Sequence, residues 1–343
     1  MHKIIYEDCI QIIKDNDMEK LRNKSFLITG ASGMIGSYVA NVLKVLNHDY
    51  NMNIRILLNV RDENKLSDEL RNDSNVTIIK QDVSERFNIE ESIDYIVHAA
   101  SPASPKIMKD YPFETNVANT VGTYNTLVLA KEKNVSGYLF VSSREIYGEP
   151  MEGVSVFTED GLLGQVNPLV PRIGYAEGKK AAENMCVGIH DEYGINTKIL
   201  RLAHTYGPGM SINDGRVQAD FLNNVINNQD IIMKSDGSSV RTYTYISDAV
   251  NALFKVLLSS NDIVYNVSGD KEVSIKDLAN VLVSLSENSK LVMDIDNTLS
   301  KGSASFKKGI LSNEKIKKEL HWYPKYNIEE GFRRTIEYLK DVK

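Results

Sequence analysis

Short apolar runs alternate with helical patterns through the first two thirds of the chain, and this alternation constrains the fold more than any other feature. Six runs have the residue content of buried strands and lie at 26–29, 54–58, 76–79, 93–97, 138–141 and 198–202. The segments between them follow helical spacing near 33–46, 62–71, 110–133 and 172–193. Strands that are joined through helices pair in parallel and are covered on both faces. The sequence therefore predicts an α/β fold built on a doubly wound parallel sheet.

The pattern changes at both ends of the chain. The apolar residues among the first twenty lie near helical spacing, which is typical of an accessory amphipathic helix. After about Thr205, turn clusters at 207–209 and 213–215 introduce shorter elements. We expect some of the chain to cross back between the two larger parts. The predicted parts are an accessory helix over 1–22, a dinucleotide-binding domain over 23–204 and a smaller α/β substrate lobe over 205–343.

Composition and charge exclude several classes of protein. The 343 residues include 40 basic and 46 acidic side chains, so the net charge of −6 does not suit a nucleic-acid binder. The longest uncharged stretch, 25–43, is too polar for a membrane span, and the first residues form no apolar signal segment. Cys9 and Cys186 are too few for a disulfide framework and lack metal-ligand spacing. We expect a cytoplasmic protein with no nucleic-acid, membrane or metal partner.

A glycine-rich junction follows the first predicted strand, where Gly30-Ala31-Ser32-Gly33-Met34-Ile35-Gly36 leads into an apolar helix. A dinucleotide pyrophosphate needs a tight turn, a bare backbone that it can approach, and a small residue where helix and strand touch, with the anion at the helix N-terminus. The alternative is a tight turn that binds no ligand. We interpret the junction as a Rossmann-type dinucleotide site formed by Gly30, Ser32, Gly33, Met34, Ile35 and Gly36.

The ends of the second and third strands bear on the choice of cofactor. At the end of the second strand, an acidic residue normally binds the ribose 2′-hydroxyl, whereas an arginine accommodates a 2′-phosphate. In this chain Asn59 suits a ribose, Arg61 suits a phosphate or the adenine ring, and Asp62 suits a helix cap. NAD and NADP therefore both remain open. Asp82 and Val83 are candidates for the adenine contact, with a turn as the alternative role.

Tyr175 and Lys179 lie one helical turn apart on the same face of a predicted helix. A phenol has a pKa of about 10, and an adjacent ammonium group lowers it by stabilising the phenolate, which makes the tyrosine a usable base. Ser143 ends the fifth strand, at the edge where parallel sheets bind ligands. It would hydrogen-bond a substrate hydroxyl and the phenol; capping of nearby backbone is the alternative. Together with the glycine junction, these three residues predict a catalytic site.

Several motifs together resemble the extended short-chain dehydrogenase/reductases that act on nucleotide sugars. They are the glycine junction, His98-Ala99-Ala100-Ser101, the serine with the Tyr175-to-Lys179 spacing, and 201–208. The resemblance covers nearly the whole chain after residue 24, and within the group it points to the UDP-glucuronate decarboxylase (UDP-xylose synthase) branch. Three runs carry this: His98-Ala99-Ala100-Ser101-Pro102-Ala103-Ser104-Pro105, Asn167-Pro168-Leu169-Val170-Pro171-Arg172 and Asn213-Asp214-Gly215-Arg216-Val217.

The resemblance implies a tightly bound NAD that accepts hydride from C4 of the sugar while Tyr175 removes the C4 hydroxyl proton. A 4-keto intermediate results, and later return of the hydride makes the reaction redox-neutral. The substrate would be a nucleoside-diphosphate sugar, UDP-linked, and the assembly a homodimer through the helices near 110–133 and 172–193. His98 would be a structural residue beneath the nicotinamide. The other residues expected at the cofactor are Ala99, Ala100, Ser101, Asn119 and Lys179.

The residues after Ser143 depart from the branch pattern. The decarboxylases resemble Thr-Ser-Glu here and the 4,6-dehydratases Thr-Asp-Glu, but this chain has Ser143-Arg144-Glu145. Arginine cannot deliver a proton at neutral pH, which disfavours 4,6-dehydration. Arg144 suits a bidentate pair with a substrate carboxylate, or else an ion pair with a nearby acid that points away from the sugar. Glu145 matches the carboxylate of the family and is the candidate general base, or water-orienting group, at C5.

Three further residues are expected at the substrate. Arg241 aligns with an arginine that contacts the diphosphate or the sugar in relatives. Arg216 is a second diphosphate ligand in this interpretation, with a surface position at a helix start as the alternative. His204 stands where relatives commonly have Asn, and Gly209 where the decarboxylases have Arg. These two differences leave the exact substrate open.

The leading hypothesis is an NAD-dependent enzyme that acts on a nucleoside-diphosphate sugar through a 4-keto intermediate, most like a UDP-glucuronate decarboxylase. A sugar 4-epimerase or 4-ketoreductase would use Tyr175 and Lys179 without needing Glu145. A 4,6-dehydratase is less favoured. A non-enzymatic dinucleotide sensor is the alternative from another class, but it would leave the serine, tyrosine and lysine without a use.

Overall fold

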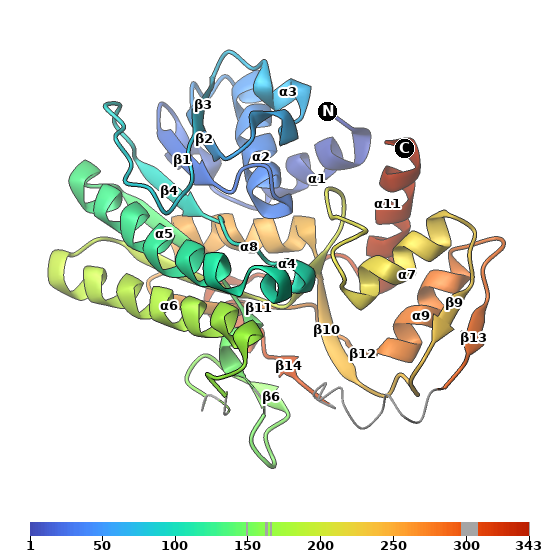
Figure 1. Cartoon of the computed structure of the whole chain (residues 1–343). Helices are drawn as coiled ribbons and strands as arrows, with labels where there is room; N and C mark the ends of the chain where they lie inside the picture. Colours follow the sequence, from blue (N-terminus) through green and yellow to red (C-terminus); the bar gives the residue numbers. More distant parts are fainter. Residues whose placement is uncertain (149, 162–163, 165–166, 296–307, 343) are drawn as a thin grey trace.

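Seven parallel strands form the central sheet of the protein (Figure 1). The computed structural model describes residues 1–148, 150–161, 164, 167–295 and 308–342. The strands are β1 (Ser25–Thr29), β2 (Arg55–Val60), β3 (Val76–Lys80), β4 (Tyr95–His98), β5 (Gly137–Ser143), β7 (Thr197–Leu202) and β11 (Val264–Val267). Their order across the sheet is β11-β7-β5-β4-β1-β2-β3, and each neighbouring pair is parallel. The predicted doubly wound α/β fold of the Rossmann type is confirmed.

Helices cover both faces of this sheet (Figure 1). On one face α5 (Pro112–Lys133) and α6 (Gly174–Tyr193) pack against each other, and on the other face lie α2 (Met34–Tyr50) and α8 (Ile246–Ser259). The side chains of β1 alternate accordingly. Leu27 belongs to the core under α5 and α6, whereas Phe26 and Ile28 belong to the core under α2 and α8. Burial on both faces explains why the strands have nearly continuous apolar sequences.

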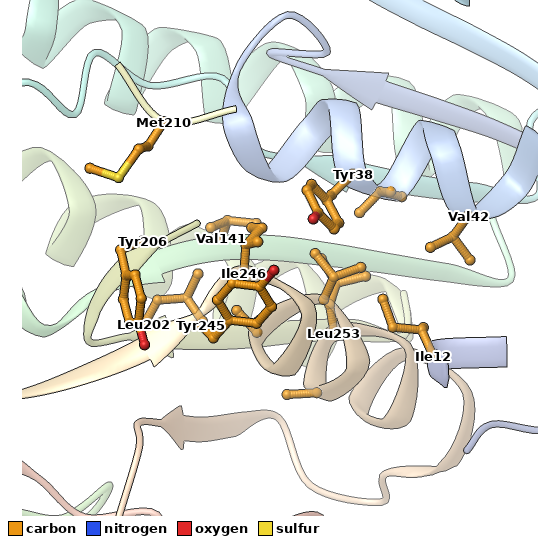
Figure 2. Packing of buried hydrophobic residues seen from close by; sticks show 14 of the residues in the cluster. Ile12, Tyr38, Val42, Val141, Leu202, Tyr206, Met210, Tyr245, Ile246 and Leu253 are labelled. Carbon is orange, nitrogen blue, oxygen red and sulfur yellow. The ribbon is translucent and has the colours of Figure 1, made fainter. Parts of the chain in front are cut away.

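The expected amphipathic helix near the start of the chain is α1 (Lys3–Lys14). It packs against α2 and α8, on the side of these helices that faces away from the central sheet. Ile12 of α1 is fully buried and lies near Val42 of α2 and Leu253 of α8 (Figure 2). The helix is therefore joined to the main body through its apolar face.

The chain beyond Leu202 builds smaller elements at one side of the central sheet (Figure 1). Three strands of one small sheet are β8 (His204–Tyr206), β10 (Val240–Tyr245) and β12 (Glu272–Ser274). Two-stranded sheets are formed by β9 (Ile231–Met233) with β13 (Leu291–Met293), and by β6 (Val156–Phe157) with β14 (Ile310–Leu311). The helices here are α7 (Val217–Ile226), α9 (Ile275–Ser284), α10 (Glu314–Leu320) and α11 (Ile328–Asp341). Since α8 and β11 pack with the central sheet, the chain crosses back to it after residue 245.

The helix expected near 110–133 is α5, which begins at Pro112 and ends at Lys133. A short helix that was not predicted, α4 (Pro105–Asp110), precedes it and is separated from it by Tyr111. Proline disfavours a helical conformation in the residue before it, and Tyr111 accordingly has φ −135° and ψ 60°. Residues of the segment that precedes α5 line the cavities described below. No helix in the described part of the chain is both long and apolar enough to cross a membrane.

The helix expected near 62–71 is shorter than its pattern suggests. A 3-10 turn at Glu63–Lys65 is followed by the single-turn helix α3 (Asp68–Arg71). Asp62 caps the turn, because its carboxylate accepts a hydrogen bond of 3.1 Å from a backbone amide two residues later. Leu66 is extended, with ψ 147°, and separates the two pieces.

Candidate active site

A cavity of about 330 Å³ opens at the carboxyl ends of β1, β4, β5 and β7, where parallel sheets bind ligands. It combines the glycine junction with the predicted catalytic residues, which are far apart in the sequence. The predicted site residues that line it are Gly30, Gly33, Met34, Ile35, Gly36, Ala99, Ser101, Ser143, Arg144, Glu145, Tyr175, Lys179, His204 and Arg216.

The glycine junction has no space for larger residues. Gly30 has φ +67°, and a Cβ there would lie 2.7 Å from the Ala100 Cα. A Cβ on Gly36 would lie 2.5 Å from the Gly30 carbonyl oxygen. Gly33 caps α2, whose first-turn amides have no acceptor within the helix. A bare turn at a helix N-terminus fits a pyrophosphate. Ser32 is exposed on the turn and is not among the described residues that line the cavity.

A second cavity, of about 380 Å³, contains two predicted adenosine contacts, Arg61 and Asp82. The Asp82 carboxylate accepts hydrogen bonds from the Ser84 amide and hydroxyl at 2.9 and 2.7 Å, and it lies 3.9 Å from the Arg61 guanidinium. Burial opposes ionisation of Asp82, but these partners lower its pKa overall. The segment 101–108 contributes residues to both cavities, so the two are neighbours.

Asn59 and Val83 do not occupy the expected positions at the cofactor. The Asn59 side chain is buried, and its amide donates to the carbonyl oxygens of Ile79 and Gln81 at 3.3 and 2.9 Å. It ties the end of β2 to β3, because a buried amide needs hydrogen-bond partners, and it lines neither cavity. Val83 is buried against Gly122 of α5. The structure thus gives both residues packing roles in place of the expected ribose and adenine contacts.

Tyr175 and Lys179 are both buried, one turn apart on α6. The Lys179 amine lies 5.9 Å from the centroid of the Tyr175 ring. Burial raises the pKa of Tyr175 to about 12, while the hydroxyls of Ser143 and Ser101 act in the opposite direction. Burial also lowers the pKa of Lys179 to about 7. The sequence predicted a lowered phenol pKa; the structure gives a raised one, because burial of the phenol outweighs the hydroxyls that favour the phenolate.

Two buried polar residues brace the lining of the cavity. Ser101 donates a hydrogen bond of 2.8 Å to the side-chain oxygen of Asn119, so Asn119 acts on the cavity through this serine. The His98 ring nitrogens lie 2.7 and 3.1 Å from the hydroxyls of Thr29 and Thr123. Burial lowers the pKa of His98 to about 3. A neutral histidine with both nitrogens occupied is a structural group.

Glu145 lies between two arginines. One of its carboxylate oxygens is 3.5 Å from Arg144 Nη1, and the other is 3.7 Å from Arg172 Nη2. Arg144 is only 4% exposed, but it lines the cavity. It can therefore pair with Glu145 and also contact a ligand in the cavity. Arg172 also lines the cavity and was not among the predicted site residues. The available signal was its position at the end of the run 167–172, just before the helix of Tyr175.

The residues predicted beyond β7 differ in their access to the cavity. His204 on β8 and Arg216 before α7 line it, whereas Arg241 on β10 is not among the described lining residues. Burial, followed by the charges of Arg144 and Arg241, lowers the pKa of His204 to about 3. Arg216 is held by Asp214, with an Nε to Oδ2 distance of 2.7 Å. Arg241 is buried because β10 is the central strand of its sheet.

This arrangement can bind a dinucleotide and carry out proton transfer at a hydroxyl group. The glycine turn and the two neighbouring cavities suit the pyrophosphate and the two ends of a dinucleotide. The phenol of Tyr175, with Ser143 beside it, suits acid-base chemistry. Three guanidinium groups, from Arg144, Arg172 and Arg216, line the same space and favour an anionic partner.

Comparison with known proteins agrees with these features. A family model described as the NAD dependent epimerase/dehydratase family matches residues 26–268. UDP-glucuronic acid decarboxylase 1 of Xenopus tropicalis is 32% identical over 318 residues, which are 92% of this chain and 72% of that protein. UDP-glucuronic acid decarboxylase 6 of Arabidopsis thaliana is 31% identical over 312 residues, which are 90% of this chain and 87% of that protein.

Solved structures share the fold. A UDP-glucose 4-epimerase from Thermotoga maritima, with UDP-glucose, has a TM-score of 0.78 at 22% identity, covering 93% of this chain and 99% of that one. A UDP-glucuronic acid 4-epimerase from Bacillus cereus, in complex with UDP-glucuronic acid and NAD, has a TM-score of 0.74 at 21% identity. It covers 93% of this chain and all of its own. At these identities the likeness concerns the fold.

Proposed function

Because the chain belongs to the NAD dependent epimerase/dehydratase family, we propose that it is an NAD-dependent enzyme that decarboxylates UDP-glucuronate through a 4-keto intermediate. UDP-glucuronic acid decarboxylase is the name of relatives that are 31–32% identical over about nine tenths of the chain, which supports this choice. One observation carries the proposal: Tyr175, Lys179 and Ser143 line a single cavity together with the glycine junction.

NAD, when bound, would accept hydride from C4 of the sugar and return it after the loss of carbon dioxide. We assign the adenosine to the cavity with Arg61 and Asp82. We assign the nicotinamide side to Ala99, Ser101 and Lys179, which line the same cavity as the glycine junction, with Asn119 holding Ser101 in place. Ala100, which was expected there as well, packs its backbone against Gly30 and is not among the described lining residues. The pyrophosphate is assigned to Gly30, Gly33, Met34, Ile35 and Gly36, where a Cβ on the first or last glycine would clash with backbone.

In this proposal Tyr175 takes the proton of the C4 hydroxyl, and Ser143 hydrogen-bonds the same group. A phenol with a pKa of about 12 holds its proton at rest. The base form is therefore produced only when positive charge stands nearby, because a cation stabilises the phenolate. Lys179 supplies such a charge in its protonated form, and its pKa of about 7 makes that form sensitive to pH near neutrality.

The arginines of the cavity support an acidic sugar. Guanidinium groups bind carboxylates and phosphates through paired hydrogen bonds. We assign Arg144 and Glu145 to the carboxylate side of the sugar, because they are adjacent at the end of β5 and close to Ser143. We assign Arg216, which lines the cavity, to the diphosphate. We assign Arg241 to the same group, because its charge acts on His204 of the cavity although Arg241 is not among the described lining residues. Oxidation at C4 makes the uronate a β-keto acid, which loses carbon dioxide as its C5–C6 bond breaks and C5 takes up a proton.

The decisive experiment is to incubate the purified chain with UDP-glucuronate and NAD and to follow the products by mass spectrometry. The expected products are carbon dioxide and a UDP-pentose, without net change in NAD. Formation of a UDP-hexuronate isomer with all six carbons would contradict decarboxylation. Failure of UDP-, dTDP-, GDP- and CDP-sugars alike to change nicotinamide absorbance or to give a product would favour a sensor without enzymatic activity.

A second candidate is a 4-epimerase acting on the same uronate, and Arg144 is the observation that favours it. An ion pair with arginine stabilises a carboxylate, and this stabilisation is lost as carbon dioxide leaves. Such a pair would slow the loss of carbon dioxide relative to return of the hydride to the other face of the 4-keto sugar. The variant Glu145→Gln separates the two functions. It should reduce decarboxylation by orders of magnitude. Exchange of the hydride at C4, which Tyr175 and Lys179 catalyse, should continue.

We also propose that the chain is a cytoplasmic homodimer joined through α5 and α6. The outer face of α5 carries apolar side chains one turn apart, with Val121 and Tyr124 exposed by 40% and 59%. Such a pair is unfavourable in water and suits burial against a second copy. We propose a functional division into an accessory helix over 1–22, a cofactor domain over 23–204 and a substrate lobe over 205–343, from which α8 and β11 cross back to the central sheet.

A further inference from the structure

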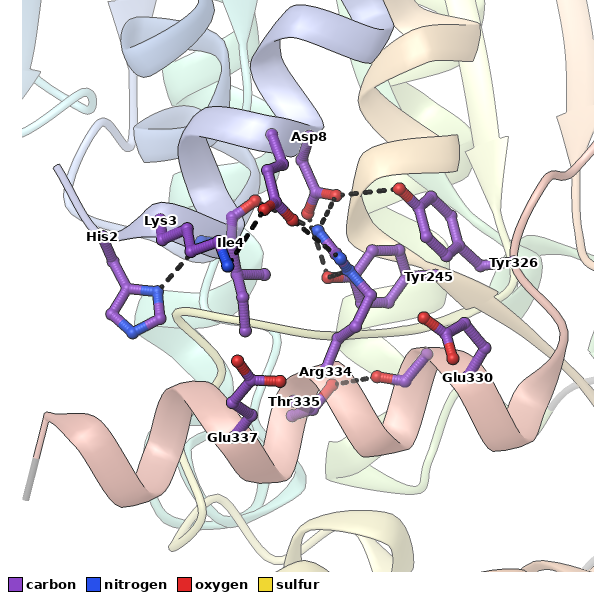
Figure 3. Close-up of polar contacts among 12 residues, drawn as sticks. His2, Lys3, Ile4, Asp8, Tyr245, Tyr326, Glu330, Arg334, Thr335 and Glu337 are labelled. Carbon is purple, nitrogen blue, oxygen red and sulfur yellow. Dashed lines mark hydrogen bonds and ion pairs between the residues drawn. The ribbon is translucent and has the colours of Figure 1, made fainter.

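The carboxylate of Asp8 is completely buried and accepts four hydrogen bonds. One oxygen accepts from the hydroxyls of Tyr38 and Tyr245 at 2.8 and 2.9 Å. The other accepts from the Tyr326 hydroxyl at 3.1 Å and from the Arg334 guanidinium at 2.8 Å (Figure 3). An ionised carboxylate has about four acceptor positions, so this group is fully used.

The donors come from elements on both sides of the proposed active site. Tyr38 is on α2, one turn after Met34, which lines the cofactor end of the cavity. Tyr245 is the last residue of β10, which pairs with β8. In this pairing Tyr245 lies opposite Tyr206, and Tyr243 lies opposite His204. His204 lines the same cavity. Asp8 therefore links the helix that carries the glycine junction to the small sheet at the other end of the cavity.

The polar groups of this cluster indicate a role beyond packing. Burial of the carboxylate raises its pKa, which reports the cost of removing its water. An apolar residue of similar size often stabilises a buried position as well as an ion pair does, but it cannot fix direction. Four directed hydrogen bonds from separate elements restrain their relative placement. The cluster also adds α1 and α11, which lie outside the region 26–268 that matches the family model.

We propose that Asp8 is a positioning residue, whose hydrogen bonds to Tyr38 and Tyr245 hold α2 and β10 in one relative placement and so align the two ends of the cavity. It touches neither substrate nor cofactor. The inference rests on the proposed function, because its main readout is turnover. A displacement of about 1 Å between reacting groups can cost roughly a hundredfold in rate. Loss of the restraint should therefore lower kcat more than it raises KM.

The test compares Asp8→Asn with Glu7→Gln in the full-length chain with NAD. Glu7 is the matched control because its carboxylate lies 3.1 Å from the same Arg334 but is 43% exposed and contacts neither tyrosine. Steady-state kinetics with UDP-glucuronate should show kcat of Asp8→Asn reduced about tenfold or more, with KM within about twofold of the parent. Glu7→Gln should match the parent in both. Equal kcat in Asp8→Asn and the parent overturns the proposal.

Tyr38→Phe and Tyr245→Phe keep the experiment decisive if Asp8→Asn does not fold. Each removes one donor to the same oxygen, so each should lower kcat, and the double variant should lower it less than the product of the single effects. Fully multiplicative effects, or unchanged kcat in both single variants, count against a shared restraint.

Hydrogen exchange provides a readout that does not depend on turnover. Amides in residues 34–38 and 240–245 should lose protection together in Asp8→Asn and retain it in Glu7→Gln. Loss of protection spread evenly over the whole chain would indicate a structural role only and would overturn the proposal. If the parent chain does not turn over UDP-glucuronate, the proposed function fails, while the exchange pattern still decides the role of Asp8.

Discussion

The Lys179 amine donates a hydrogen bond of 2.7 Å to the carbonyl oxygen of Val141. This bond ties the central part of α6 to β5, the strand that ends at Ser143. The amine also lies 4.4 Å from the centroid of the Phe140 ring, where a cation is attracted by the ring face. The lysine is thus held at a fixed distance from Tyr175 by the sheet itself, and this constraint makes its chemistry testable.

Lys179→Met should reduce turnover while leaving the chain folded. The methionine fills a similar volume but supplies no charge to stabilise the Tyr175 phenolate, so we expect kcat to fall by about 10² to 10⁴. Lys180→Met is the matched control, because Lys180 is the next residue on α6 and pairs with Glu177 at 2.9 Å. Steady-state kinetics with UDP-glucuronate measure both. A Lys179→Met variant with parental kcat would remove this lysine from the proposed chemistry.

The lowered pKa of Lys179 should appear in the pH dependence of stability. The pKa is about 7 in the folded chain and has its ordinary value of 10.5 in the unfolded chain. Between these values the unfolded chain binds one more proton, so the free energy of unfolding should rise with pH by up to about 1.4 kcal/mol per pH unit from this group. Below about pH 7 the contribution to the slope vanishes.

Urea unfolding at pH 7, 8 and 9 of the parent and Lys179→Met measures this contribution. The parent should gain stability relative to the variant across this range, because methionine does not titrate. A difference between the two proteins that stays constant with pH would show that the folded and unfolded pKa values of the lysine are the same.

Gly30→Ala should abolish tight binding of NAD. Gly30 has φ +67°, and a Cβ at this position would lie 2.7 Å from the backbone of Ala100. Gly194→Ala is a closely matched control, because Gly194 has φ +68° but no heavy atom within 4 Å of the added Cβ among the described residues. Both variants bear the strain of positive φ, about 1–2 kcal/mol, but only Gly30→Ala adds a clash with rigid backbone.

Calorimetric titration with NAD and thermal unfolding measure the two effects separately. We expect affinity for NAD to fall by more than about tenfold in Gly30→Ala and to stay at the parental value in Gly194→Ala. Parental affinity in Gly30→Ala would contradict the assignment of the pyrophosphate to this turn.

Val121→Arg should weaken the proposed homodimer. Val121 is 40% exposed on the outer face of α5, and a buried arginine without a partner at an interface is strongly unfavourable. Val292→Arg is the control, since Val292 is also 40% exposed but lies on β13, away from α5 and α6. Size-exclusion chromatography with light scattering should give a dimeric parent and control and a monomeric Val121→Arg. A monomeric parent would refute this mode of assembly.

Local patterns in the sequence were enough to predict the fold and to single out residues that the structure brings to one cavity. Strand and helix periodicities depend on neighbouring residues, so the alternation of the two already implied a parallel sheet with its ligand edge at the strand ends. The glycine junction and the spacing of Tyr175 and Lys179 are local in the same sense. The residues at 105–110 show the limit of this approach, because a helix as short as α4 has too few residues to show a helical period.

Tertiary structure alone decided how polar groups are used. The sequence predicted Asn59 as a ribose ligand, but its amide donates to the carbonyl oxygens of Ile79 and Gln81. Glu145 pairs with Arg172, which comes from another element. Burial raises the pKa of Tyr175. Because burial depends on the whole fold, the spacing between Tyr175 and Lys179 could not predict this rise. Asp8 meets donors that lie 30 to 326 residues away in the chain. Desolvation and long-range hydrogen bonding arise only when distant segments pack together, so periodicity and spacing cannot reveal them.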